Sequence, residues 1–324
     1  MPLVSEGVYS AFDAYPHRLM PVRTVGSPLH SRRKYIALPL LLLVGLFLFA
    51  AFASPERRSL HPYFNARKFF VIAHRGGRGL GPEGTLPVFR RAVEMGVDVL
   101  EMDVRVSADG ALVVFHDARV DRVTDGMGRV DSLTLDQLKG LDAGFRWRSE
   151  AGAYAYRGRG LRILTLEEIL RAFPRQRMLL ELKPEAAGVA RDLCASVRAH
   201  DMLDRVVVAS FHGEAVQAFR DACPEVATSA SAGEVARYWL LHQLRLDDLY
   251  SVDFQVFQVP ERLRWIGLVD RRFVASARAR NLPVEVWTVN KREQMEHLLD
   301  LGVNGIITDH PDLLLELLRE RSMR

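Results

Sequence analysis

The sequence predicts an α/β fold, a (β/α)8 TIM-type barrel with one β-hairpin and one loop insertion, preceded by a single transmembrane helix. Three observations support this. Short apolar runs alternate with longer amphipathic segments from residue 69 onward, one uncharged apolar run precedes them, and a single pair of runs is joined too tightly for a crossover helix. Parallel strands with crossover helices produce such alternation. A doubly wound open sheet is the structural alternative.

Composition and charge limit the class of protein. The 324 residues are 48% hydrophobic, which is enough for one large domain or two small ones. Lys and Arg outnumber Asp and Glu by 44 to 40, and much of the surplus flanks the apolar run. We interpret this basicity as membrane-flanking charge and expect no nucleic-acid partner. Cys194 and Cys223 are too few and too far apart for a zinc site or a disulfide framework, so we expect two half-buried thiols on helices.

The N-terminal region indicates a membrane anchor. Residues 1–34 contain several prolines and no sustained periodicity, which is typical of a disordered, cytoplasmic tail. The run from Ile36 to Ala53 carries no charge and would span about 27 Å as a helix, close to the hydrocarbon thickness of a bilayer. We predict a single-pass anchor over residues 35–54 and a linker over 55–68, with the following domain on the extracytoplasmic side because basic residues precede the run. A cleaved signal ending near Ala53 is the alternative.

The remainder of the chain, residues 69–318, is predicted to be one barrel domain. Its candidate strands are Phe69–Ala73, Val97–Val106, Ala111–Phe115, Met178–Leu182, Val206–Ser210, Val226–Ser229, Val252–Val259, Val284–Val289 and Gly305–Thr308. Only Ser107–Gly110 joins the second and third, and its Asp-Gly pair favours a hairpin turn. One arm of the hairpin is then an appendage, and the other runs can close a barrel. Residues 144–160 form the irregular loop insertion.

Charged side chains and histidines lie at the C-terminal ends of these runs, where a parallel barrel assembles its active site. They are His74 and Arg75, Glu101 and Asp103, His116, and Glu181 and Lys183. The three carboxylates suit a hard divalent cation, Ca²⁺ or Mg²⁺, rather than zinc. The arginine and lysine suit a phosphate, and the two histidines suit proton transfer near neutral pH.

Seven short motifs, in order, carry a resemblance to a known family. They are His74-Arg75-Gly76, Gly81–Thr85, Glu101–Val104, His116-Asp117, Glu181-Leu182-Lys183, Trp287–Asn290 and Gly305–Asp309. Through them the chain resembles the glycerophosphodiester phosphodiesterases from about Phe70 to about Leu314. The resemblance implies a barrel, a divalent cation held by Glu101, Asp103 and Glu181, and acid/base work by His74 and His116.

The resemblance also implies substrate contacts. Arg75 and Lys183 would contact the phosphate, and Glu83 would have a role at the rim. The chain departs from the family where Gly84 replaces the usual asparagine, which puts a loop hydrogen bond near Glu83 in doubt. Trp287 either lines the substrate pocket or belongs to the core, and we expect Asp309 to cap the final helix.

The function expected from these residues is metal-dependent hydrolysis of glycerophosphodiesters to glycerol 3-phosphate and an alcohol, by an enzyme whose partner is the membrane lipid bilayer. One alternative is lysophospholipase D action on membrane lysophospholipids. Another is a catalytically inactive phosphodiester-binding membrane protein. The loop at 144–160 and the helix near Trp239 contain aromatic residues with arginines close by, which fits either a lipid headgroup surface or a lid. Which histidine is acid and whether water or a substrate hydroxyl attacks stay open.

Overall fold

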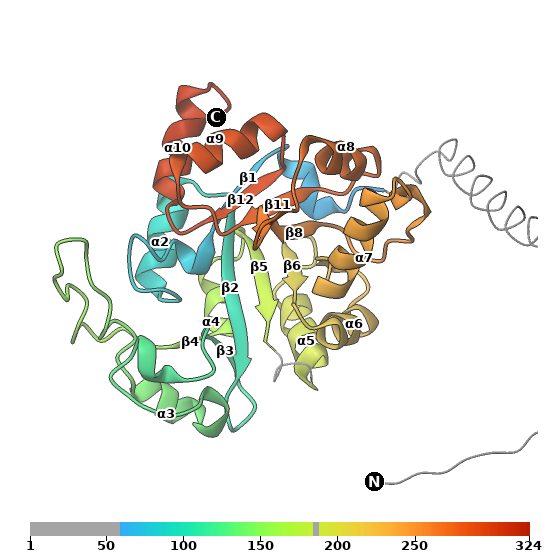
Figure 1. The fold of residues 1–324 in the computed structure, drawn as a ribbon. Coiled ribbons are helices and arrows are strands. Elements are labelled where there is room, and N and C mark those ends of the chain that lie inside the picture. The colour runs from blue at the N-terminus through green and yellow to red at the C-terminus, as the bar shows by residue number, and fades with distance from the viewer. Residues whose placement is uncertain (1–58, 184–187) are drawn as a thin grey trace, which may run out of the picture. The chain divides into compact units, whose positions relative to one another are not determined.

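A closed barrel of parallel strands forms the centre of the computed structural model, which describes residues 59–183 and 188–324. Within these ranges the strands run in the order β7-β6-β5-β2-β1-β12-β11-β8, and neighbours pair in parallel. A bridge between Ser229 and Val256 joins the two ends of this order. Helices surround the strands (Figure 1). The predicted TIM-type barrel is confirmed.

The elements follow one another as βα units. The barrel strands are β1 (Phe70–Ala73), β2 (Val99–Val106), β5 (Arg177–Leu182), β6 (Val206–Ala209), β7 (Ala227–Thr228), β8 (Phe257–Pro260), β11 (Val284–Trp287) and β12 (Gly305–Thr308). The helices are α2 (Leu86–Met95), α3 (Leu135–Gly140), α4 (Leu166–Ala172), α5 (Ala190–Ala199), α6 (Gly213–Ala222), α7 (Ala232–Gln243), α8 (Arg271–Ala279), α9 (Arg292–Leu301) and α10 (Pro311–Glu320). Short strands β3 (Leu112–Val114), β4 (Leu164–Thr165), β9 (Arg262–Leu263) and β10 (Ile266–Gly267) complete the set, with 3-10 helices η1 (Pro62–Ala66), η2 (His74–Gly76), η3 (Val120–Arg122), η4 (Val130–Ser132) and η6 (Asp247–Leu249).

The predicted hairpin is present, and its second arm, β3, lies outside the barrel. Strand β3 pairs antiparallel with the end of β2, with Val114 opposite Val104, and β4 then pairs antiparallel with β3. Neither β3 nor β4 belongs to the closed order of parallel strands. The outer arm of the hairpin is therefore the appendage that the short Ser107–Gly110 connection predicted.

Strand β2 shows how the barrel separates its two faces. Leu100 and Met102 pack in the main core that includes the surrounding helices. Val99 belongs instead to the apolar cluster inside the barrel. Because side chains alternate along a strand, Glu101 and Asp103 share the inward face with Val99. The interior is thus apolar at one end and charged at the other.

The apolar end of the barrel is closed by residues that precede β1. Tyr63 and Phe64 of η1 are buried and pack against Phe70, the first edge-on and the second tilted, with ring centroids 5.7 and 6.4 Å away. The Arg177 guanidinium donates a hydrogen bond to the Tyr63 carbonyl at 3.0 Å. Part of the segment predicted as a linker, residues 55–68, therefore packs beneath the barrel.

The predicted tail (1–34) and anchor (35–54) lie outside the described residues and stay predictions. Across residues 59–183 and 188–324, every helix is too short or too polar to cross a membrane.

The loop insertion at residues 144–160 contains neither helix nor strand. Its aromatic rings pack on its own arginines, since the Arg157 guanidinium lies 4.2 Å from the Phe145 ring centroid and 3.6 Å from that of Tyr154. The Trp147 indole donates to the Arg78 carbonyl at 3.5 Å. These contacts place the loop against the segment that follows β1, beside the barrel mouth.

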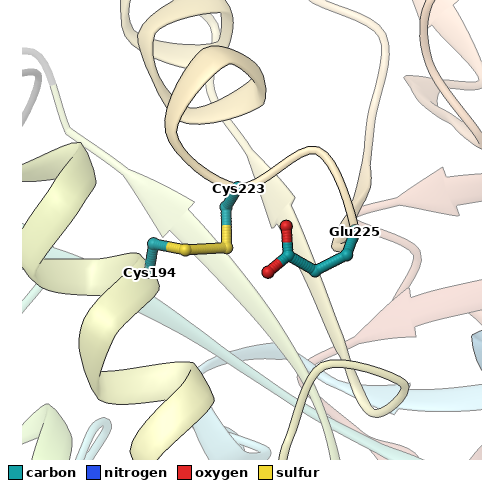
Figure 2. A group of neighbouring side chains, drawn as sticks. All are labelled: Cys194, Cys223 and Glu225. Atoms are coloured by element: carbon teal, nitrogen blue, oxygen red, sulfur yellow. A yellow bond between two sulfur atoms is a disulfide. The ribbon is translucent and has the colours of Figure 1, made fainter.

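The prediction of two unpaired thiols is wrong. Cys194 of α5 and Cys223, which ends α6, form a disulfide with Cα atoms 5.6 Å apart (Figure 2). Glu225 lies close to both sulfurs, but bonded sulfurs are not free to act as thiolate ligands. The separation of 29 residues equals about one βα unit, so the two cysteines fall on neighbouring helices. Sequence spacing looked too wide because barrel geometry, not chain distance, brings them together.

Removing the disulfide should destabilise the barrel. Closing a loop of this length in the unfolded chain contributes about 3–4 kcal/mol, so a Cys194→Ala/Cys223→Ala variant should lose roughly 10 °C in Tm. The measurement is thermal unfolding by circular dichroism with and without dithiothreitol. Wild type should shift on reduction and the double variant should not. A wild-type Tm that is the same with and without dithiothreitol would contradict the disulfide.

An acidic side chain lies inside the barrel below the charged end. Glu285 of β11 is 1% exposed and accepts a hydrogen bond from Gln258 at 2.7 Å, while its second oxygen has no partner among the described residues. Burial raises the pKa of Glu285 to about 7. Its side chain packs over Gly305, where a Cβ would lie 3.0 Å from the Glu285 Cγ. The carboxyl group of Glu285 therefore keeps its proton to a higher pH than an exposed glutamate does.

This burial makes stability depend on pH. Between the ordinary Glu value of 4.5 and about 7 the native state binds the proton more tightly than the unfolded state, so the free energy of unfolding falls as pH rises through this range. Glu285→Gln removes the penalty, which is on the order of 3 kcal/mol. We expect the variant to match wild type at pH 4, below this range, and to exceed its Tm at pH 8. The exposed Glu293→Gln is the control, and equal pH dependence in all three proteins would contradict the assignment.

Candidate active site

The register of the strands places the polar side chains together at the barrel mouth. Ala73 of β1 lies opposite both Leu100 of β2 and Thr308 of β12. The next residues along each chain, His74, Glu101 and Asp309, therefore stand at one level. On the other side of β2, Asp103 lies opposite Glu181 of β5. Four adjacent strands thus present their charged residues to one space.

Three carboxylates form a cluster at this mouth. One oxygen from each of Glu101, Asp103 and Glu181 lies within 4.8 Å of the others. Glu101 and Asp103 are 4% and 3% exposed. Burial, with the neighbouring acids adding to it, raises the pKa of Glu101 to about 7, and burial also raises the pKa of Glu181. Such a cluster is costly without positive charge beside it.

Two cationic side chains compensate the cluster. The Lys183 ammonium lies 2.6 Å from an Asp103 oxygen and also contacts Glu181. The Arg75 guanidinium lies 3.4 Å from the other Asp103 oxygen and donates to Glu83 at 2.9 Å. Both cations are nearly buried, yet both line the central cavity. They can therefore face a bound anion while staying beside the carboxylates.

The backbone at Arg75 also belongs to the site. Its φ of 49° is left-handed, which is uncommon for a residue with a side chain. In this conformation the Arg75 amide donates to Glu101 at 2.6 Å. At the next residue, Gly76, a Cβ would lie 2.8 Å from both Phe89 and Val88, so only glycine fits. The sharp turn is thus held by a carboxylate on one side and by helix α2 on the other.

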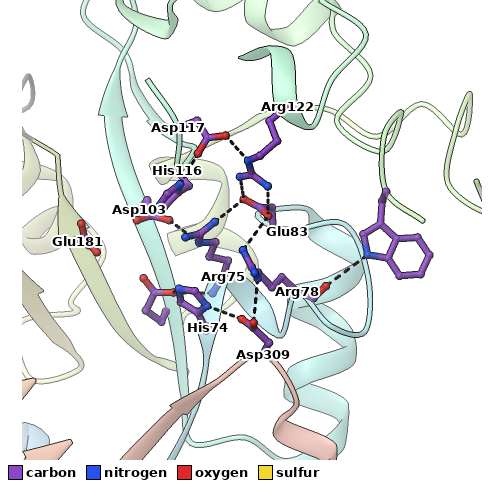
Figure 3. Close-up of polar contacts among 12 residues, drawn as sticks. His74, Arg75, Arg78, Glu83, Asp103, His116, Asp117, Arg122, Glu181 and Asp309 are labelled. Atoms are coloured by element: carbon purple, nitrogen blue, oxygen red, sulfur yellow. Dashed lines mark hydrogen bonds and ion pairs between the residues drawn. The ribbon is translucent and has the colours of Figure 1, made fainter. Parts of the chain in front are cut away.

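Each histidine is oriented by a carboxylate, as Figure 3 shows. The His74 Nδ1 lies 2.6 Å from Asp309, and the His116 Nδ1 lies 2.6 Å from Asp117. A carboxylate only accepts, so both Nδ1 atoms donate and both Nε2 atoms are left for proton exchange. The His74 Nε2 lies 4.0 Å from Glu101. In both histidines, Nε2 is therefore the ring nitrogen available for proton transfer.

Their environments shift the two histidines in opposite directions. Burial lowers the pKa of His74, but the charge of Glu101 and the hydrogen bond to Asp309 outweigh it and the pKa is raised. For His116 burial is the largest influence and, with the Arg75 charge, lowers the pKa. Two imidazoles whose pKa values are shifted in opposite directions are suited to act as one proton donor and one proton acceptor.

A cavity of about 670 Å³ opens above this set. Both histidines, Arg75 and Lys183 line it at one end. Trp287 lines it as well, and its ring packs edge-on against Phe211 with centroids 5.4 Å apart. Of the two alternatives for Trp287, the structure therefore favours the pocket over the core.

Comparison with known proteins identifies the family. The model of the glycerophosphoryl diester phosphodiesterase family matches residues 74–313. The chain belongs to this family. A glycerophosphodiester phosphodiesterase of Caldanaerobacter subterraneus is 30% identical over 260 residues, covering 78% of this chain and 99% of the relative. The family predicted from the motifs is confirmed, and the chain is an enzyme, a phosphoric diester hydrolase.

Solved structures agree with this assignment. The glycerophosphoryl diester phosphodiesterase domain of a Mycobacterium tuberculosis protein covers 79% of this chain and 100% of its own, with a TM-score of 0.68 and 23% identity, and shares the fold. An Oleispira antarctica phosphodiesterase in complex with the product sn-glycerol-3-phosphate has 26% identity and a TM-score of 0.61, covering 77% of this chain and 96% of its own.

Three residues of this phosphodiesterase have roles that the sequence did not show. Asp309, expected to cap α10, does not do so: the capping residue of α10 is His310, which makes no side-chain cap. Asp309 instead accepts from His74 and from Asn290, the latter at 2.8 Å. The other two residues with unexpected roles are Asp117 and Arg122. Asp117 accepts a hydrogen bond from His116 and so orients its ring, and Asp117 also pairs with Arg122. Arg122 belongs to none of the motifs from which the site was predicted, so no sequence pattern indicated that it should be included.

Glu83 and its neighbour lie beside the cavity. The Glu83 carboxylate pairs with Arg75 at 2.9 Å and with both terminal nitrogens of Arg122. It therefore positions Arg75 and does not line the 670 Å³ cavity. Gly84, where the family usually has asparagine, has a φ of +69° and donates its amide to the Arg75 carbonyl at 3.2 Å. Glycine and asparagine both tolerate this conformation, so the backbone contact is kept.

Weakening the Asp309–His74 pair should impair the reaction. Asp309→Asn cannot stabilise a protonated imidazole, so we expect kcat/KM to fall roughly ten-fold or more. The limb of the pH profile that belongs to His74 should move to lower pH. Asp312→Asn, an exposed acid in the first turn of α10, is the matched control. Unchanged activity and pH profile in Asp309→Asn would contradict the positioning role.

Proposed function

We propose that this enzyme hydrolyses glycerophosphodiesters to glycerol 3-phosphate and an alcohol in a metal-dependent reaction at the barrel mouth. The observation that carries the proposal is the cluster of Glu101, Asp103 and Glu181, with oxygens within 4.8 Å of one another beside two histidines. The product named in the Oleispira antarctica complex supports glycerol 3-phosphate as the retained product.

The carboxylates fit a divalent cation. Oxygens that ligate one Ca²⁺ lie about 2.3–2.6 Å from it, so two of them are at most about 5 Å apart, and Mg²⁺ needs a slightly tighter set. The spacing within 4.8 Å meets this condition. Glu101, Asp103 and Glu181 would hold the ion, whose chemistry there is to neutralise charge on the phosphate oxygens. The crowding of the three carboxylates and the raised pKa values of Glu101 and Glu181 fit a site completed by positive charge.

The protein's own side chains account for the remaining steps. Arg75 and Lys183 offset the negative charge of the phosphodiester. One of His74 and His116 takes the proton from the attacking hydroxyl or water, and the other gives a proton to the leaving alkoxide. One P–O bond forms and one breaks, so charge and protons balance.

We also propose that the domain works on the extracytoplasmic side, held by the predicted anchor at residues 35–54. The Cys194–Cys223 disulfide supports this, because such bonds persist in oxidising compartments and are rare in the cytosol. Labelling of thiols in freshly opened cells tests it. Free thiols at both positions would contradict the placement.

The activity can be tested with the full chain in lipid nanodiscs and glycerophosphocholine as substrate. Glycerol 3-phosphate should be released only with a divalent cation, and a chelator should abolish release. Returning Ca²⁺ or Mg²⁺ separately shows which ion serves. We expect Glu101→Gln to lose roughly a hundred-fold in kcat through weaker metal binding and His116→Ala roughly 10²- to 10⁴-fold.

The matched control is Glu293→Gln, an exposed carboxylate of α9, which should equal wild type. Full activity after chelation would contradict the metal. Full activity of His116→Ala would contradict its role in proton transfer.

A further inference from the structure

The cavity above the catalytic residues is longer than the reaction requires and changes character along its length. One end holds the ionisable groups described above. The other end, called here the apolar arm, is lined by Ala232, Val235, Ala236, Trp239, Leu240, Leu263, Ile266 and Leu268. No charged side chain lines the arm, within the part of the chain that is described. A glycerophosphodiester headgroup is polar throughout and would leave this lining without a complementary ligand.

One wall of the apolar arm is a fixed helix face. Ala232, Val235, Ala236 and Trp239 follow the spacing of a single stripe on α7. Ser231 and Glu234 form a capping box at the start of this helix, and Arg220 of α6 pairs with Glu234 at 2.8 Å. The wall is therefore anchored to the neighbouring helix and does not depend on a ligand.

The opposite wall is the β9–β10 hairpin. Leu263 and Ile266 pair across it and both line the arm, although they are 55% and 36% exposed. At the turn Trp265 is 72% exposed, with the Arg264 guanidinium 4.6 Å from its ring centroid. Leu240 of α7, across the arm, is 56% exposed. Exposed apolar side chains gathered around the mouth of a cavity mark a binding surface for an apolar ligand.

The loop at residues 144–160, expected to contact lipid or to cover the mouth, does not contribute to this surface. None of its residues lines the cavity, because its Phe145 and Tyr154 rings pack on Arg157 and its Trp147 and Tyr156 rings pack on each other. Trp239 and Leu240, from the helix that the sequence grouped with that loop, do line the arm.

We propose that the apolar arm binds a single acyl chain that is covalently part of the substrate, so that the preferred substrates are lysophospholipids with one chain on the glycerol. This inference rests on the proposed function, because the phosphodiester must sit between the histidines and Lys183 while the chain runs toward α7. Continuity within one cavity carries it, since the same space is lined by His116 at one end and by Leu263 at the other. An acyl chain gives the arm a partner of matching polarity.

A chain-length series tests the arm. The full chain in lipid nanodiscs is given glycerophosphocholine and its 1-hexanoyl and 1-octanoyl derivatives, below the concentrations at which they form micelles. Each methylene buried in the arm contributes up to about four-fold in kcat/KM, so we expect at least five-fold between hexanoyl and octanoyl. Because these substrates are monomeric, a gain with length reports the cavity. A gain that appears only with long chains in vesicles would indicate a surface effect and overturn the proposal.

A variant that fills the arm gives the second test. Val235→Trp should lower kcat/KM for the octanoyl substrate about ten-fold more than for glycerophosphocholine. Leu244→Trp, on the same helix but 53% exposed and outside the cavity lining, is the control and should keep the wild-type ratio. An unchanged substrate ratio in Val235→Trp overturns the acyl arm.

The experiments distinguish an error in the proposed acyl-chain site from an error in the proposed function. Turnover of glycerophosphocholine without any gain from an acyl chain would contradict the arm alone. If no phosphodiester is cleaved, the proposed function fails, and binding of the octanoyl compound, followed by isothermal titration calorimetry, still tests the arm. Binding by wild type and its loss in Val235→Trp would support the arm, and equal binding would overturn it.

Discussion

The repulsion among three closely spaced carboxylates, two of them buried, is the constraint on which the rest of this mouth depends. Glu101, Asp103 and Glu181 are brought within 4.8 Å by the parallel register of β2 and β5. Arg75 and Lys183 must then lie beside them, and a left-handed turn at Arg75 lets its amide hold Glu101 as well. Each neighbouring feature, from the strict glycine at 76 to the Glu83–Arg122 contacts, keeps that arginine in place. The carboxylates that the reaction uses can therefore be accommodated in the fold only because Arg75 and Lys183 lie beside them.

Much of this could be predicted from the sequence, because alternation of apolar runs fixes a parallel sheet and the ends of its strands share one edge. The carboxylates, the histidines and the two cations all came together where expected. The predictions failed where a contact depends on tertiary proximity alone. Cys194 and Cys223 are joined across adjacent helices, Asp309 turns toward His74, and Arg122 has no sequence neighbour that marks it. Trp287 could be placed in the pocket only once the cavity was known.

Two kinds of stabilisation operate in the same barrel. Apolar packing inside and outside the strands supplies most of the core, and Tyr63 and Phe64 close its lower end. The Cys194–Cys223 bond then ties α5 to α6 on one side. Glu285 works in the other direction, since a carboxyl group enclosed beneath the active site remains favourable only while it keeps its proton. The fold thus tolerates ionisable groups in its interior at more than one depth.

The barrel rim is divided into two arcs with different freedom to change. Most of the ionisable residues lie on or directly after β12, β1, β2 and β5, which are consecutive in the sheet, and His116 and Asp117 follow β3, which pairs with β2. A shift in any of these strands would displace a charged partner. The apolar arm comes from α7 and the β9–β10 hairpin, which carry no group of that network. Insertions or replacements in this second arc could alter which molecules enter without disturbing bond cleavage. Substrate range could therefore diverge rapidly between related enzymes while their chemistry stays the same.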